Sequence, residues 1–378
     1  MRKLLIAAFI LCSVFARAED GKSEISLISS LPDLNFGVYG VIDTGYRYSY
    51  RNAEDTVGGR LGLDSGLQRT SRIGFTAEAG VWEDFKAGAV LERGLSTDTG
   101  TEPGGWNRQA FLYISNPEYG KIAFGKQLSS TYILDTKFDP FNHNSDAGLN
   151  AVNKYIQRTD NTTAYYSPEW GGFSFMSGFS LNIDGDENPG GTGDKNLFFV
   201  TPQFTRGNFS SAVNMLYYRY KNPASGGTEN LEAADFFALY DFGIFKLTGY
   251  YGFKRAPDGD FVLYGSEGKD TQEFMIGATV PVSKKSFFLG TYKRRVTEVY
   301  AGGPDAAVGE LSVGYNYRPI KDFLIYLVWS NIVNNSAARE SMLNGGVLGS
   351  DICGYKYQSS IMAGAAFAFD LDIHVKQQ

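Results

Sequence analysis

Residues 36–51, FGVYGVIDTGYRYSYR, decide the fold. Phe36 and Tyr46 fall on one parity of this stretch, while Asp43 and Arg47 fall on the other. Successive side chains of a β-strand point to opposite faces, so the stretch predicts a strand with one apolar face and one partly charged face. A water-soluble β-sandwich would bury the apolar face, whereas a membrane barrel would turn it toward lipid.

Composition and the first residues favour an exported β-protein. The 378 residues include 45 Gly, 24 Tyr and 28 Phe, a mixture typical of all-β proteins. Residues 1–18, MRKLLIAAFILCSVFARA, combine a basic start, an apolar run and an A-x-A site, and they predict a secretory signal peptide cleaved after Ala18. Three of the 35 Lys and Arg residues and none of the 41 acids lie in this segment, which leaves a net charge of about -9. Nucleic acid is therefore not an expected partner.

The two cysteines do not predict a disulfide. Cys12 lies within the signal peptide and follows Leu11, where a lipoprotein signal would need a small residue. Cys353 is then the only cysteine of the mature chain. We assign residues 19–34 to an amino-terminal extension and residues 35–378 to one β-domain.

After the signal peptide, the apolar runs are too short for a spanning helix. The longest, FLIYLVWSNIV at residues 323–333, has 11 residues, whereas a spanning helix needs about 17 to 25 and a spanning strand about 9 to 11. Unpaired backbone groups are costly in hydrocarbon, so a membrane protein built from strands must close into a barrel.

Sixteen segments of the chain have strand character, and the connections between them alternate in length. Short turns such as 206–207 and 241–243 separate long polar loops such as 182–196, 221–230 and 334–351. This sorting is typical of an outer-membrane barrel, in which short turns face the periplasm and long loops face outside. The predicted strands are residues 35–50, 66–79, 84–96, 106–116, 120–128, 158–168, 172–183, 195–205, 208–221, 231–242, 245–256, 270–281, 286–300, 307–318, 322–334 and 354–369.

Alternation in the strands predicts which side chains line a wet lumen. In residues 310–318 and 245–254, polar side chains alternate with apolar ones, which fits a polar interior and an apolar exterior. The side chains expected in the lumen are Asp43, Arg47, Glu92, Lys246, Glu310 and Arg318.

Five blocks of sequence resemble landmarks of a known family. They are FGVYGVIDT (36–44), SRIGFTAE (71–78), NRQAFLY (107–113), YGKIAFGKQ (119–127) and RTDNTTAYYSP (158–168). In this order they resemble the Gram-negative general porins of the neisserial and other proteobacterial type. After about residue 180 the resemblance is limited to the repeating pattern of strands and loops. It implies an antiparallel transmembrane barrel of sixteen strands in the outer membrane, a homotrimer, and diffusion of ions and small hydrophilic solutes through a lumen narrowed by the third long loop.

The resemblance also implies a constriction with opposed charges. It places Arg72, Arg108, Arg158 and Lys126 on a basic wall, facing Asp135, Asp139 and Asp146 of the third loop. Such an arrangement creates a transverse field that favours ions over apolar solutes. Arg108 fits least well, because Ala110 and Leu112 share its parity and make that face apolar. The alternative is that the arginines pair with strand acids and only brace the wall.

Residues 129–157 are expected to form the constriction loop. This segment has 29 residues, far more than the usual connection of about 4 to 6. It is rich in apolar residues such as Leu134, Phe138 and Phe141, which disordered segments lack. A barrel of about 16 strands leaves an aqueous channel that its own side chains do not fill, so an inward-folded loop would set the size limit.

Catalytic and metal sites are not expected. Barrel enzymes need a positioned base, and the chain has only His143 and His374. Asp184 and Asp186 begin like a calcium loop, but Pro189 takes the glycine position of that motif. We therefore predict no enzyme and no cofactor, although acidic loops remain candidates for divalent ions that bridge lipopolysaccharide.

The sequence thus predicts a passive channel, and two alternatives stay open. One is a substrate-specific channel, for example for sugars; the other is a structural or adhesive barrel with a closed lumen. Porins of this type usually end on an aromatic residue that the assembly machinery reads, whereas this chain continues past Phe369 as DLDIHVKQQ. We therefore expect an assembly signal that is internal or weakened.

Overall fold

A computed structural model describes residues 34–53, 57–101, 104–142, 146–149, 156–221, 226–255, 270–298, 304–335 and 355–375. The predicted signal peptide, residues 19–33 of the extension, His143 and Cys353 lie outside these residues, as does the side chain of His374.

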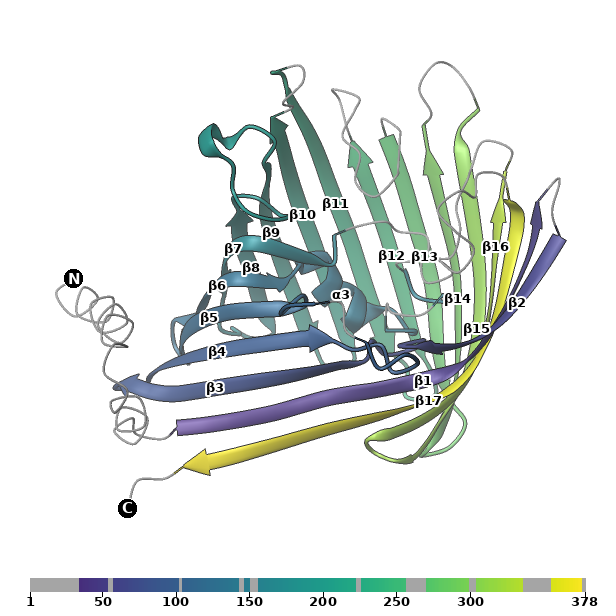
Figure 1. Cartoon of the computed structure of the whole chain (residues 1–378), viewed down its shortest axis with the longest axis horizontal. Coiled ribbons are helices and arrows are strands. Elements are labelled where there is room, and N and C mark those ends of the chain that lie inside the picture. The colour runs from purple at the N-terminus through teal and green to yellow at the C-terminus, as the bar shows by residue number, and fades with distance from the viewer. Residues whose placement is uncertain are drawn as a thin grey trace.

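The described residues form one closed antiparallel barrel (Figure 1). Strand β1 pairs with β17 over nearly its whole length, from Leu34 opposite Val375 to Asn52 opposite Tyr357, and this pairing closes the sheet. The strands are β1 (Leu34–Ala53), β2 (Val57–Ser65), β3 (Arg72–Trp82), β4 (Phe85–Gly94), β5 (Gln109–Asn116), β6 (Gly120–Leu128), β7 (Arg158–Tyr166), β8 (Phe173–Ser180), β9 (Lys195–Arg206), β10 (Phe209–Lys221), β11 (Thr228–Asp241), β12 (Lys246–Arg255), β13 (Asp270–Pro281), β14 (Ser286–Thr297), β15 (Ala306–Ile320), β16 (Phe323–Asn334) and β17 (Tyr355–Val375).

Seventeen strands occupy sixteen positions around the barrel, as the sequence predicted. Both β2 and β3 pair with β1, β2 with residues 44–52 and β3 with residues 35–41, so the two share one position. The expected strand at 66–79 was wrong at its start. Residues 66–71 leave the wall between β2 and β3, because Gly66 turns the chain with a φ of 69°.

Side chains alternate between the two faces of the wall as predicted. On β15, Glu310 and Ser312 are buried in the interior, whereas Leu311 and Val313 are each 46% exposed on the outside. On β1, Asp43 and Arg47 face inward. The apolar face of β1 therefore points toward lipid. Lipid covers these side chains, so no second sheet is needed to bury them.

Connections are sorted by length between the two rims. Only two residues separate β3 from β4, β9 from β10 and β15 from β16, whereas residues 95–108, 129–157 and 181–194 connect strands at the opposite rim. The rim with the short turns also carries the start of β1 and the end of β17. In barrels of this type that rim faces the periplasm.

The terminal strand continues beyond Phe369. Residues 370–375 pair with residues 34–39 of β1, so this part of the tail completes the barrel wall. Within the residues described, no helix has both the length and the apolar character needed to span a membrane.

Candidate functional site

The long connection between β6 and β7 enters the barrel and carries helix α3 (Ser130–Phe138), which Figure 1 shows inside the wall. Ser129 begins the helix, because its side-chain oxygen accepts a hydrogen bond from the backbone N–H of Tyr132 at 3.1 Å. Asp139 ends it, and its N–H donates to the carbonyl oxygen of Asp135 at 2.8 Å. The sequence predicted the inward loop but no helix within it.

A polar contact positions the first turn of α3 on the wall. Ser130 Oγ donates to Asn214 Oδ1 of β10 at 2.8 Å, and Asn214 Nδ2 donates to Thr131 Oγ1 at 2.9 Å. All three side chains are buried. Buried amides need both their donors and their acceptors satisfied, so this contact specifies one position for the helix.

The rest of α3 packs on an apolar patch of the lumen face. Leu134 and Phe138 pack with Phe237, Tyr250 and Met275 of strands β11 to β13, and the ring centroids of Phe138 and Phe237 lie 5.3 Å apart. Burial of one such side chain contributes about 1.5 to 3 kcal/mol to the stability of the folded protein. Alternation analysis missed these residues. Their signal is the loss of alternation itself, because FFALY at residues 236–240 has apolar side chains on both faces.

Two lumen-facing glycines receive the residues after the helix. A Cβ added to Gly277 would lie 2.9 Å from Pro140 Cγ, and one added to Gly314 would lie 2.7 Å from Phe141 Cε1. Phe141 is fully buried in a cluster with Leu67. The missing side chains of the two glycines therefore leave the space that the loop occupies.

Buried charges fix the tip of the loop, residues 146–149. Asp146 accepts hydrogen bonds from Arg47 Nη1 of β1 at 3.1 Å and from Ser360 Oγ of β17 at 2.8 Å. Lys293 Nζ of β14 donates to the carbonyl oxygens of Ala147 and Gly148, each at 2.6 Å, and pairs with Glu310 at 2.8 Å. The tip is thus held by three strands of the far wall.

The three loop acids have other contacts than those expected. Asp146 binds Arg47, and Asp139 accepts the backbone N–H groups of Phe141 and Leu149. Asp135 lies buried beside Asp235 and Tyr250, on the side of β11 and β12. The expectation that these acids face the basic wall must be corrected. Asp139 and Asp146 instead hold the loop in place, and Asp135 faces the strands on which α3 packs.

Three arginines gather around one carboxylate on the other side of the lumen. Arg72 Nε lies 3.4 Å from Glu92 Oε2, and Arg108 Nε lies 2.6 Å from Glu92 Oε1. Arg158 is close enough to both arginines to interact electrostatically, and its guanidinium lies 5.5 Å from the ring centroid of Tyr132. Nε and Nη2 of Arg158 are buried with no hydrogen-bond partner among the described residues. This cluster keeps an excess of positive charge.

Arg108 and Lys126 show why parity alone was a poor guide. Arg108 precedes β5, so it does not follow the parity of that strand, and its N–H donates to the Glu92 carbonyl oxygen at 3.2 Å. Lys126 follows Gly125, whose φ of 126° marks a break in register. Lys126 forms an ion pair with Asp160 of β7, so it braces the wall. The alternative interpretation concerned the arginines, and Arg72 and Arg108 do pair with the strand acid Glu92.

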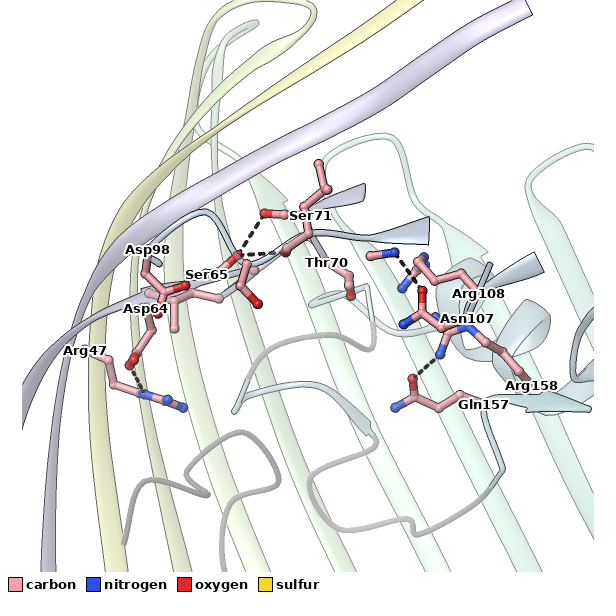
Figure 2. Close-up of a pocket in the computed structure, with 15 residues that line it drawn as sticks. Arg47, Asp64, Ser65, Thr70, Ser71, Asp98, Asn107, Arg108, Gln157 and Arg158 are labelled. Carbon is pink, nitrogen blue, oxygen red and sulfur yellow. Dashed lines mark hydrogen bonds and ion pairs between the residues drawn. The ribbon is translucent and has the colours of Figure 1, made fainter. Parts of the chain in front are cut away.

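A cavity of about 440 Å³ separates charges of opposite sign (Figure 2). Asp64 and Asp98 lie at one end of it with Arg47, and Arg108 and Arg158 lie at the other. Arg47 Nε donates to Asp64 at 2.8 Å. The acids across this cavity from Arg108 and Arg158 come from β2 and from the connection after β4.

Asp43 holds the inward segment 66–71 in place. Its carboxylate accepts the backbone N–H groups of Gln68 and Arg69 and, at 2.6 Å, the hydroxyl of Tyr326. Asp43 was expected to line a wet lumen, but its side chain is fully buried and braces this segment. Burial, together with the nearby charge of Arg318, lowers the pKa of Arg69.

The remaining residues expected in the lumen have these contacts. Glu310 pairs with Lys293, while Lys246 lies 3.4 Å from Asp241 near the rim of short turns. The guanidinium carbon of Arg318 lies over the ring of Phe287, 5.0 Å from the ring centroid. Among the described residues, no group of three or more His, Cys, Asp or Glu side chains could hold a metal ion.

Loop residue Lys137 lies on the side of α3 that faces the short turns. Its Nζ donates to Gln203 Oε1 at 3.3 Å and to Thr205 Oγ1 at 3.5 Å, and burial lowers the pKa of this amine.

Known proteins with the same architecture are porins. Outer membrane porin protein 32 of Delftia acidovorans is 24% identical over 383 residues, covering 98% of this chain and all of that protein. Chitoporin of Vibrio furnissii is 30% identical over 189 residues, which are 46% of this chain and 48% of that protein. The solved anion-selective porin from Comamonas acidovorans is 20% identical, with a TM-score of 0.75 over 89% of this chain and 100% of that one. The family model for Gram-negative porins matches residues 5–336. The chain therefore belongs to the Gram-negative porin family.

Proposed function

We propose that this porin is a passive diffusion channel for ions and small hydrophilic solutes, and not an enzyme. The observation that carries the proposal is a closed barrel with a polar inner face, in which a folded-in loop narrows the lumen beside a cavity with opposed charges. A barrel of about 16 strands is too wide for its own side chains to fill, so water occupies the remaining space. The loop at residues 129–157 would set the size limit.

Planar-bilayer recording tests this function. Purified protein should insert in stable steps whose current is proportional to voltage, because diffusion through a wet lumen needs no gating event. A correctly folded barrel that never conducts would contradict the proposal and favour the structural or adhesive alternative.

A substrate-specific sugar channel is the second candidate, favoured by the partial similarity to a chitoporin. In a specific channel, neutral oligosaccharides would interrupt the ion current at concentrations well below those at which they act on a general pore. Chitooligosaccharides and maltooligosaccharides of matched length are the comparison, since a general channel would treat the two alike.

We further propose that the protein is a homotrimer of the outer membrane, exported by the cleavable signal peptide. Trimeric porins among the solved structures of this fold support that assembly. Acidic residues of the long loops would bind lipopolysaccharide through divalent cations.

A further inference from the structure

A second hollow of about 410 Å³ lies beneath α3, on the side of the short turns. We call it the vestibule hollow and define it by Lys137, Phe138, Leu239, Lys246, Phe287 and Arg318. Residues of the turn between β11 and β12 also line it, which places it toward the periplasmic rim. It shares no lining residue with the cavity near Arg108.

One wall of the vestibule hollow is apolar, although it belongs to the polar face of the barrel. Leu239 of β11 and Phe287 of β14 both face the lumen and are only partly buried. In the rest of this region the loop covers the apolar lumen residues, as Phe138 covers Phe237. Partly uncovered apolar surface with a few polar groups around it is typical of sites for small molecules.

The polar groups of the vestibule hollow carry excess positive charge. The guanidinium of Arg318 lies over the ring of Phe287, and its Nε is buried with no hydrogen-bond partner among the described residues. Lys137 has the long contacts to Gln203 and Thr205 described above, lies 5.4 Å from the ring centroid of Phe138, and is close enough to Glu169 to interact electrostatically. A guanidinium with an unused donor, held beside an aromatic ring, matches the planar geometry of a carboxylate.

The acids of the vestibule hollow are already engaged. Asp139 accepts the backbone N–H groups of Phe141 and Leu149, and Asp241 accepts that of Gly243 at 2.8 Å. Asp241 also pairs with Lys246. Three cationic side chains therefore face two carboxylates whose oxygens are bound within their own loops and turns, which leaves Arg318 and Lys137 available to an anion.

We propose that the vestibule hollow binds small organic anions that combine a carboxylate with an apolar body, above all aromatic carboxylates. The carboxylate would accept from Arg318 and Lys137, and the ring would cover Leu239 and Phe287. This inference rests on the proposed channel function, since the ligand reaches the hollow through the lumen. It predicts that neither a small carboxylate without a ring nor a neutral aromatic alcohol binds there.

The test is the current of single open channels with benzoate added to the compartment that faces the short turns. Benzoate should reduce the chloride current in a saturable way, whereas acetate and benzyl alcohol at the same concentration should not. Arg318→Gln should weaken the block about tenfold, the effect of losing about 1.4 kcal/mol from a charge-assisted contact. Leu239→Asn should weaken it without changing any charge. Lys321→Gln, in the exposed turn after β15, is the matched control and should leave the block unchanged.

The outcomes separate the two proposals. Channels that conduct normally but are not blocked by benzoate would overturn the vestibule site and leave the channel function intact. Protein that never conducts would overturn the channel function. Equal block by acetate would show that charge alone acts, and equal block by benzyl alcohol that the ring alone acts; either result rejects the site. If Arg318→Gln fails to fold, Leu239→Asn still decides, and the anomalous signal of 4-bromobenzoate soaked into crystals of the unmodified protein shows directly whether the hollow is occupied.

Discussion

Gly314 shows at the residue scale how a missing side chain positions a distant loop. The edge of the Phe141 ring occupies the space where a Cβ of residue 314 would stand, so the ring can pack on the lumen face of β15 and β16. In a well-packed site, added atoms displace their neighbours at a cost of about 1 to 3 kcal/mol. The loop is the neighbour that can move, because the barrel wall is held by continuous backbone hydrogen bonding.

We therefore expect Gly314→Val to push the loop toward the centre of the lumen or out of it, and to change the single-channel conductance. Gly249→Val is the control, because nothing lies within 4 Å of a Cβ at that position. Identical conductance for the Gly314 variant and unmodified protein would mean that Phe141 does not hold the loop.

Lys293 is the second informative residue, because it ties the loop tip to the wall from a fully buried position. Lys293→Met should leave Glu310 buried without its cation and release two loop carbonyls. Removal of one partner from a buried pair costs about 3 to 5 kcal/mol, so the folded barrel should denature at lower temperature in a heat-modifiability gel.

The comparison for Lys293→Met is Lys86→Met, which breaks the exposed pair with Glu78. Such surface pairs contribute about 0 to 1 kcal/mol, so this variant should keep the original denaturation temperature. Equal shifts for both variants would contradict a special role for Lys293.

The arginine cluster should set the ion preference of the lumen. Replacing Arg72 and Arg158 together by Ser removes two positive charges from around Glu92, so the reversal potential in a salt gradient should shift toward cations. The matched control replaces the same two arginines by Lys, which keeps both positive charges and should leave the potential unchanged. If the double variant keeps the original reversal potential, these arginines do not face the path of the ions.

At the scale of elements, the connection between β6 and β7 behaves as a folded insert with its own anchors. Asn214 seats the beginning of α3, apolar residues of β11 to β13 hold its end, and Lys293 fixes the tip. The segment 66–71 packs against the same insert, because Leu67 shares a buried cluster with Phe141. Two elements, and not one, therefore reduce the open section of the lumen.

Excision of residues 135–150 with a short Gly-Ser linker should raise conductance and admit larger sugars in a liposome swelling assay. The expected increase is partial, since segment 66–71 remains in the lumen. The variant must still run as a folded barrel on a gel. An unchanged size cutoff in such a barrel would show that the loop does not limit passage.

At the scale of the whole molecule, closure of the barrel depends on its two ends. Strand β17 pairs with β1 down to Val375, so residues 370–375 contribute backbone pairing to the wall. An assembly signal in this chain would therefore lie within or beside a paired strand.

Export can be tested on the mature protein. Cleavage after Ala18 should leave Glu19 as the first residue, because the A-x-A site follows directly on the apolar run. Intact mass spectrometry of protein isolated from outer membranes measures this. Retention of Met1 in that material would contradict the predicted signal peptide.

The sequence by itself determined the architecture, because the period of a strand is local. Alternation along 36–51 and 310–318 identified the lipid face, and the lengths of the connections identified the two rims. The apolar content of residues 129–157 predicted that this loop packs inside. Each of these signals is complete within a short stretch of chain.

Only the tertiary structure decided which charges meet. Asp146 and Arg47 are 99 residues apart in sequence, and Asp43 and Tyr326 are 283 apart. Such pairs form because the barrel closes and the loop crosses it, and no local pattern records either path. For the same reason the acids at the cavity are Asp64 and Asp98 and not the expected acids of the loop. Strand β2 also went unrecognised, because its glycine-rich stretch has weak strand propensity and is stabilised by pairing with β1.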